Sequence, residues 1–189
     1  MKLHRLLQAA VLTIWLLGNI PLTAQDKWTP ADIMAKAKPG MWVKLEGMVQ
    51  EDLSVLAGEI RFLTGDFMDD DWELKAKVDT VGPAENSFQV LAIPVKVTRE
   101  TDFDKGIRSM DDIKPGMFIE LEGTYLKDGV FLAKEIEDVT DRKKNRLPSE
   151  RKIEAVGKVG QVDETKGTIS VMGIQFYITE KTEGRSPIR

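Results

Sequence analysis

The sequence repeats itself, and this duplication constrains the fold more than any other feature. Residues 38–60 align with residues 114–136 without a gap at a spacing of 76, and 12 of the 23 positions are identical. A second match, at a spacing of 81, aligns residues 78–101 with residues 159–182 and keeps the apolar pattern with weaker identity. The chain is therefore expected to contain copies of one structural unit, which must be assigned before the whole fold.

Each copy has the sequence pattern of short β-strands. Apolar and polar residues alternate around Val43 and Leu45, and the second copy repeats the alternation. Such a period of two is typical of a strand with one buried face. Asp128-Gly129, between two runs of this kind, predicts a tight hairpin.

A short helix is expected before the fourth strand of each unit. Thr29 and Ser109 are both good helix caps, and each is followed three residues later by an acid. The order of elements in one unit is then three strands, a short helix and two strands, which is the order of a five-stranded OB-type barrel. Residues 72–140 contain one whole unit and form the predicted central OB-like barrel.

The two ends of the chain carry complementary halves of the unit. Residues 29–66 hold the helix and the last two strands, and residues 150–184 hold the first three strands. An unpaired half would expose strand edges and an apolar face, so we expect the halves to combine into a second barrel. The alternative is that two chains complete each other by exchanging halves. The predicted fold class is all-β: two small five-stranded OB-like antiparallel barrels, each with one short helix, plus an N-terminal signal peptide.

Residues 1–24 have the features of a secretory signal peptide. Lys2 and Arg5 precede a mostly apolar run that ends at Leu17, and Ala24 supplies a small residue for cleavage. The alternative is a membrane anchor, which needs about 20 consecutive apolar residues. We expect a periplasmic or secreted protein without a membrane span after cleavage.

The composition removes several classes of chemistry from the predicted mature chain. The chain has no cysteine, and its one histidine, His4, lies in the signal peptide. Zinc, haem and the commonest nucleophile–base pairs depend on these residues. Removing Lys2 and Arg5 from the 27 basic residues leaves 25 against 31 acidic ones, a net charge of −6 that disfavours nucleic acid. We expect no enzyme, because a glycosidase needs two carboxylates in different environments and several glutamates here recur in both copies.

Charged connectors flank the central unit and supply the candidate site residues. Asp66, Asp69, Asp70 and Asp71 could ligate Ca²⁺, which prefers oxygen ligands; the alternative is a solvated acidic loop. Trp72, just after them, could contact a partner or fill the interface between the barrels. The basic connector could bind an anionic polymer, pair with the acidic connector, or serve as a plain linker. Its basic residues are Arg142, Lys143, Lys144 and Arg146.

The central unit resembles a known domain family. The resemblance rests on the motifs VKVT at 95–98, IKPG at 113–116, IELEG at 119–123 and AKEI at 133–136. These are similar to a family of bacterial exported domains, domain of unknown function 5666, whose members are thought to be OB-like. The resemblance implies a fold but brings no catalytic residues, since the family has no known chemistry to transfer.

The sequence thus leads to two expectations about function. The first is a non-catalytic exported binding or assembly module, without a cofactor, that engages another envelope protein or an extracellular polymer such as a polysaccharide. OB-type barrels bind through one face and its loops. The second is a periplasmic protein that binds a cation, with Ca²⁺ the expected ion, or senses a small ligand through the acidic connector.

Overall fold

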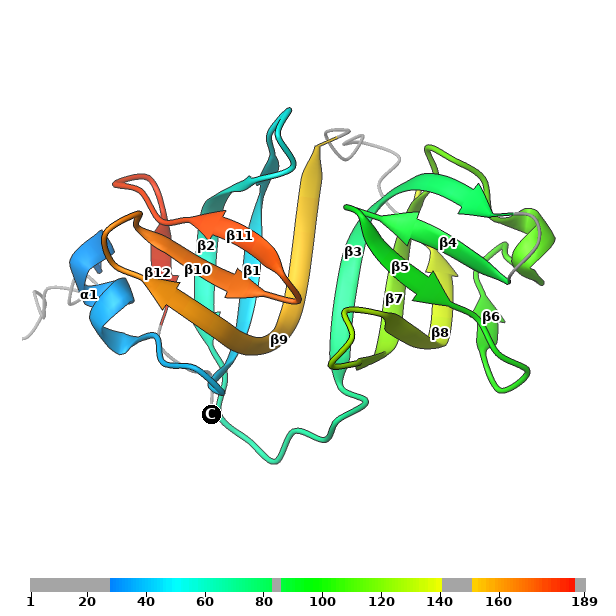
Figure 1. Ribbon diagram of the computed structural model, residues 1–189, viewed down its shortest axis with the longest axis horizontal. Coiled ribbons are helices and arrows are strands. Elements are labelled where there is room, and N and C mark those ends of the chain that lie inside the picture. Colours follow the sequence, from blue (N-terminus) through cyan, green and yellow to red (C-terminus); the bar gives the residue numbers. More distant parts are fainter. Residues whose placement is uncertain (1–27, 83–85, 141–150, 186–189) are drawn as a thin grey trace, which may run out of the picture.

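The computed structural model describes residues 28–82, 86–140 and 151–185, and within them the fold is mostly β-strand. Figure 1 shows two groups of strands side by side, one built from the middle of the chain and the other from its two ends. The predicted signal peptide, residues 1–24, lies outside the described residues. No helix in the described part is long and apolar enough to cross a membrane.

Five strands from the middle of the chain close into a barrel. Ladders join β3 to β4, β4 to β5, β5 to β8, β8 to β7, and β7 back to β3. All of these ladders are antiparallel except the one between β5 and β8. We call this the central barrel. Its strands are β3 (Trp72–Gly82), β4 (Ser87–Val90), β5 (Ile93–Lys96), β7 (Phe118–Tyr125) and β8 (Phe131–Asp138), with β6 (Asp102–Asp104) paired to β8 outside the circuit.

Five strands from the two ends of the chain pair around a second closed circuit, which we call the outer ring. The long ladder between β1 and β9 joins the two ends, with Trp42 opposite Lys158 and Met48 opposite Lys152. The other ladders join β1 to β2, β9 to β10, β10 to β11, and β11 to β2. The strands are β1 (Trp42–Val49), β2 (Val55–Phe62), β9 (Lys152–Asp163), β10 (Thr168–Val171) and β11 (Ile174–Tyr177), with β12 (Glu183–Arg185) paired to β2.

A buried threonine contact recurs at matching positions of the two groups of strands. The Thr101 hydroxyl donates to the carbonyl oxygen of Ala133 at 2.7 Å. The Thr182 hydroxyl donates to the carbonyl oxygen of Ala57 at 2.8 Å. Each hydroxyl also accepts a hydrogen bond from the backbone N–H of the threonine three residues before it. The sequence repeat therefore corresponds to a repeat of local structure.

The two predicted helices differ in the structure. Thr29 caps α1 (Pro30–Lys36) with a capping box, because its hydroxyl accepts from the Asp32 N–H while the Asp32 carboxylate accepts from the Thr29 N–H. Ser109, in contrast, starts only a single 3₁₀ turn (Met110–Asp112). The short helix expected in the central unit is therefore present only as this single turn. Pro115 follows within a few residues and disfavours helical backbone just before it.

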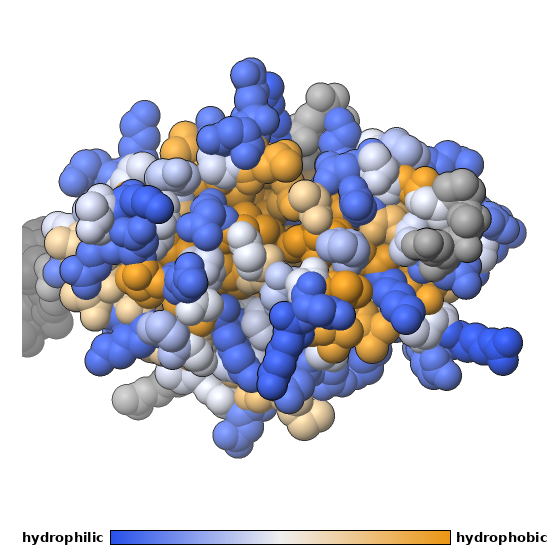
Figure 2. Space-filling view, in the orientation of Figure 1, coloured by the Kyte–Doolittle hydropathy of each residue, from blue (hydrophilic) through white to orange (hydrophobic). Residues whose placement is uncertain are grey.

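The central barrel and the outer ring meet along a short antiparallel ladder between β3 and β9. The ladder pairs Leu74 with Ala155 and the residues on either side of them. Trp72 is buried beside it, with its ring centroid 5.2 Å from that of Trp42 and 5.6 Å from that of Tyr125. Figure 2 shows that apolar residues gather at the middle of one face of the molecule, between two hydrophilic ends. The buried residues of both groups form one continuous core.

Candidate functional site: an acidic face of the central barrel

One outward face of the central barrel carries carboxylates at directly opposed positions of neighbouring strands. Glu122 of β7 lies opposite Glu73 of β3 and Glu135 of β8. Two residues earlier on β7, Glu120 lies opposite Glu137 of β8. Strand β6 then adds two aspartates opposite the β8 glutamates. We call this set the acidic face: Glu73, Glu120, Glu122, Glu135, Glu137, Asp102 and Asp104.

The carboxylates of the acidic face are close enough to disturb one another. Oxygens of Asp104, Glu135 and Glu137, which we call the carboxylate triad, all lie within 4.8 Å of one another. Burial raises the pKa of Glu135, and neighbouring carboxylates, Glu122 first among them, raise it further. Burial also raises the pKa of Glu73, although a nearby lysine opposes this shift. Like charges that face each other across strands destabilise a sheet, so this face carries an electrostatic cost.

The outer ring has a net positive charge at the positions that match the carboxylate triad. Arg61 lies 2.8 Å from the Glu59 carboxylate, and Arg185 lies 3.1 Å from it. By the spacings of 76 and 81, Glu59 matches Glu135, while the two arginines match the other two acids of the triad. In the outer ring, this carboxylate therefore lies between two guanidinium groups. In the central barrel, the matching carboxylate lies beside two other carboxylates.

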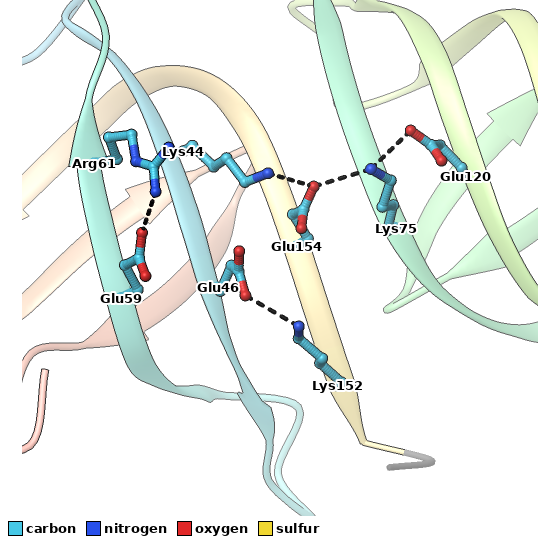
Figure 3. A network of polar contacts seen from close by, with 8 residues as sticks. All are labelled: Lys44, Glu46, Glu59, Arg61, Lys75, Glu120, Lys152 and Glu154. Carbon is cyan, nitrogen blue, oxygen red and sulfur yellow. Dashed lines mark hydrogen bonds and ion pairs between the residues drawn. The ribbon is translucent and has the colours of Figure 1, made fainter. Parts of the chain in front are cut away.

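A chain of ion pairs crosses from the outer ring to the acidic face. Lys44 lies 2.7 Å from Glu154, Glu154 lies 3.0 Å from Lys75, and Lys75 lies 2.8 Å from Glu120 (Figure 3). Burial acts to raise the pKa of Glu154, but hydrogen bonds and charge from the two lysines outweigh it and lower that pKa. Lys44 itself occupies the position that matches Glu120, so it is another cation where the central barrel has an acid.

The acidic face continues into a pocket beside the connector between β2 and β3. The cavity has a volume of about 440 Å³. Phe67 and Val156 give it apolar walls, and Lys134 supplies its cationic group. Five carboxylates line it, three from the connector and two from the acidic face: Asp66, Asp70, Asp71, Glu73 and Glu122.

The structure gives three of the four predicted aspartate ligands different partners. Asp69 lies 3.0 Å from Lys158 of β9, and Asp70 lies 2.6 Å from Lys134 of β8. The Asp71 carboxylate accepts a hydrogen bond from the Met68 N–H at 2.6 Å. The connector is thus fastened to the outer ring by one aspartate and to the central barrel by the next. Among the described residues, the group of three or more acids whose oxygens are close enough to hold one metal ion is the carboxylate triad.

The other predicted site residues fall at the junction or outside the described ranges. Trp72 is only 8% exposed and lies at the junction of central barrel and outer ring. The basic connector residues Arg142, Lys143, Lys144 and Arg146 lie outside the described residues, and so does their suggested pairing with the acidic connector.

The carboxylate triad is not apparent from the strand pattern of the sequence. Its glutamates sit at outward positions of a strand, whereas the inward, apolar positions define the pattern. A usable signal was present in the alignment of the two copies. Glu137 and Asp104 stand where the other copy has Arg61 and Arg185, a reversal of charge at two positions that the register brings together.

Comparison with curated proteins and comparison with solved structures each give no match. The family model described as "Domain of unknown function (DUF5666)" matches residues 75–137, a segment that begins in β3 and ends in β8. The match confirms the expected resemblance to this family of domains of unknown function over the central barrel, the part of the chain that carries the acidic face.

Proposed function

We propose that this protein is a non-catalytic exported binding module whose acidic face binds a cationic segment of another envelope protein. In this proposal the central barrel and the outer ring are two OB-like barrels, the second made from both chain ends. OB-type barrels bind through one sheet face and adjoining loops. The acidic face lies on such a sheet, and the pocket beside the connector extends it.

The observation that supports the proposal is the unequal charge of the two copies. The acidic face has seven carboxylates, and two lysines, Lys75 and Lys105, form ion pairs with them. On the outer ring, Arg61 and Arg185 neutralise the matching position. The fold therefore accommodates cations here, and their replacement by acids leaves a cost that a bound cationic group would remove.

An exported protein would meet other envelope proteins, which supports a partner of this kind. The expectation of export rests on the sequence alone. Lys2, Arg5 and the apolar run that follows predict a cleaved signal peptide. Mass determination of the secreted or periplasmic protein tests this, with cleavage expected after Ala24. The proposal contains no catalytic step, because the mature chain would lack histidine and cysteine.

The proposal is tested by copying the charges of the outer ring onto the acidic face. In the triple variant Asp104→Arg, Glu120→Lys and Glu137→Arg, each position takes the residue that the other copy has. Binding of a fluorescent lysine-rich peptide is measured by anisotropy at low and moderate salt. We expect the affinity of the variant to fall at least tenfold and its salt dependence to flatten.

A matched control changes one charge on the outer ring instead. Glu183→Lys should leave peptide binding within twofold of the wild type, because Glu183 lies on β12, away from the acidic face. Equal peptide affinity in the triple variant and the wild type would refute the proposal. Far-ultraviolet circular dichroism verifies that the triple variant is folded.

A divalent cation is a second candidate ligand, favoured by the spacing of the carboxylate triad. Ca²⁺ takes six to eight oxygen ligands, and the oxygens of Glu135, Glu137 and Asp104 lie within 4.8 Å of one another. If the ion binds there, Ca²⁺ should raise the melting temperature and Glu135→Gln with Glu137→Gln should abolish the rise. If the connector binds it, the rise should be lost in Asp70→Asn with Asp71→Asn instead.

A further inference from the structure

The tip of the β1–β2 hairpin holds a leucine in a backbone conformation that favours glycine. Leu53 has a φ of 65°, in the left-handed region. The matching hairpin of the central barrel, between β7 and β8, has Gly129 at the corresponding place, with a φ of 86°. A leucine in this conformation is strained, because its Cβ crowds the backbone, whereas glycine is not.

The two hairpins are otherwise built alike. The Gln50 N–H donates to the Ser54 carbonyl at 2.7 Å, and the Leu53 N–H donates to the Gln50 carbonyl at 3.2 Å. The corresponding bonds in the central barrel are 2.8 and 3.0 Å long. In each turn an aspartate carboxylate also accepts the N–H two residues further on. The strain at Leu53 therefore comes from the residue and not from a different turn.

Leu53 contributes little packing to the fold that could offset this strain. Its side chain is 49% exposed and is not among the residues packed against the core. In Figure 1 the β1–β2 hairpin extends beyond the other strands of the outer ring. A strained residue that persists at an exposed tip points to a role in function rather than in folding.

Exposed apolar residues continue from the tip along the hairpin. Met48 of β1 lies opposite Leu56 of β2, and Leu56 pairs with Tyr177 of β11. All three are large, exposed apolar side chains. We call Met48, Leu53, Leu56 and Tyr177 the hairpin patch.

The central barrel does not repeat this patch. At the positions that match Met48 and Tyr177 it has Thr124 and Lys96. The apolar surface, and a leucine in place of glycine at this hairpin position, therefore distinguish the outer ring from the central barrel. Exposed apolar patches of this kind mark sites of interaction.

The charges at the tip indicate the chemistry of the partner. Glu51 and Asp52 are both exposed, next to Leu53. The Glu51 side chain is 91% exposed and lies 3.9 Å from the guanidinium group of Arg151. We infer that the hairpin patch inserts Leu53 into an apolar pocket, rimmed by lysine or arginine side chains, on a partner protein. This inference rests on the proposed function, because it adds a second contact with the same protein partner. The hairpin patch that makes this contact is a different surface from the acidic face.

The test places a photoreactive amino acid at Leu56 of the full-length chain in the cells that produce it. Irradiation should give an adduct with another protein. Leu53→Gly and Glu51→Lys should each weaken the adduct at least fivefold. Leu53→Gly should also raise the melting temperature by a few degrees, and Gly129→Leu in the other hairpin should lower it. The same probe at Leu132, the position that matches Leu56, should give no adduct that depends on Leu53.

The other outcomes would overturn the inference. No adduct, or an adduct unchanged by Leu53→Gly, would remove the docking role. A lower melting temperature in Leu53→Gly would show that the leucine serves folding. An adduct between two copies of this chain, or binding to vesicles with anionic lipids that Leu53→Gly abolishes, would assign the patch to self-association or to a membrane. The triple variant of the acidic face should leave the Leu56 adduct detectable, so failure of one site is distinguishable from failure of the other.

Discussion

Replacing Gly157 by alanine should destabilise the junction between central barrel and outer ring, because the added Cβ would overlap one neighbouring side chain, that of Trp72. A Cβ at Gly157 would lie 2.4 and 2.5 Å from two carbons of the Trp72 ring, and 3.1 Å from a methyl carbon of Val171. No such distance is tolerated, so the indole must move. Overpacking of a buried site costs about 1–3 kcal/mol, which corresponds to about 2–4 °C per kcal/mol in a chain of this size.

The repeat supplies the compensating change. Gly157 matches Ala76 and Trp72 matches Ile153. The glycine–tryptophan pair, which spans the two copies, therefore corresponds to an alanine–isoleucine pair in which the partner side chain is smaller. In a Trp72→Ile background, Gly157→Ala should cost less than about 0.5 kcal/mol, giving a coupling energy of at least about 0.5 kcal/mol.

The assay is urea unfolding followed by far-ultraviolet circular dichroism, which does not depend on the tryptophan removed. Gly58→Ala is the control, since its added Cβ would come no closer than 3.7 Å to a neighbouring atom and should be nearly neutral. An equal cost of Gly157→Ala in both backgrounds would show that Trp72 is not the obstacle, and the reasoning would fail.

Four further predictions concern stability. Thr101→Val and Thr182→Val should each cost about 1–3 kcal/mol in urea unfolding, because each leaves a buried carbonyl without its donor; a large difference between them would contradict equivalent roles. Glu135→Gln should raise the melting temperature at pH 7; the gain should shrink once the pH falls below the raised pKa of Glu135 and vanish below the ordinary pKa of a glutamate, where both the folded and the unfolded state are protonated. Glu154→Gln should instead lower the melting temperature at pH 7, and this loss should disappear once the pH has fallen below the lowered pKa of Glu154. A change of melting temperature in the same direction for both glutamate variants would contradict the opposite pKa shifts assigned to the two residues. The fragment 72–140 should unfold cooperatively by itself, as calorimetry would show, and a non-cooperative melt would refute its independence.

Much of the strand architecture could be predicted from the sequence because its causes are local. Alternation around Val43 and Leu45 marks a strand with one buried face, and both side chains are fully buried in β1. The capping box at Thr29 also depends only on neighbouring residues. The helix expected after Ser109 is only one turn long, because Pro115 follows Ser109 so closely that a longer helix does not fit between them.

The candidate site was less predictable because it depends on register. Asp66, Asp70 and Asp71 do line an acidic pocket, yet adjacency in sequence did not bring their carboxylates into a shared ligand group. Glu135 and Asp104 are far apart in sequence and meet only because β6 pairs in parallel with β8. Strand pairing of this kind is set by closure of the barrel, which no local pattern encodes.

The ladder between β3 and β9 explains how one duplicated unit came to have two different surfaces. Leu74 pairs there with Ala155, and these two residues match each other in the repeat at a spacing of 81. The residue before Leu74 pairs with the match of the residue after it, and the residue after Leu74 pairs with the match of the residue before it. A strand that pairs antiparallel with its own copy is the interface of a two-fold dimer, in which the same surface meets itself.

Within one chain the two sides of such an interface are free to differ. Lys75 makes its ion pair with Glu154 across the ladder, but Val156 stands at the position that matches Lys75, and the symmetric pair with Glu73 is lost. A homodimer changes both halves with every substitution, whereas this chain can change one. That freedom allows an acidic face on the central barrel and an apolar, strained hairpin on the outer ring, two surfaces that a symmetric dimer would have to carry twice.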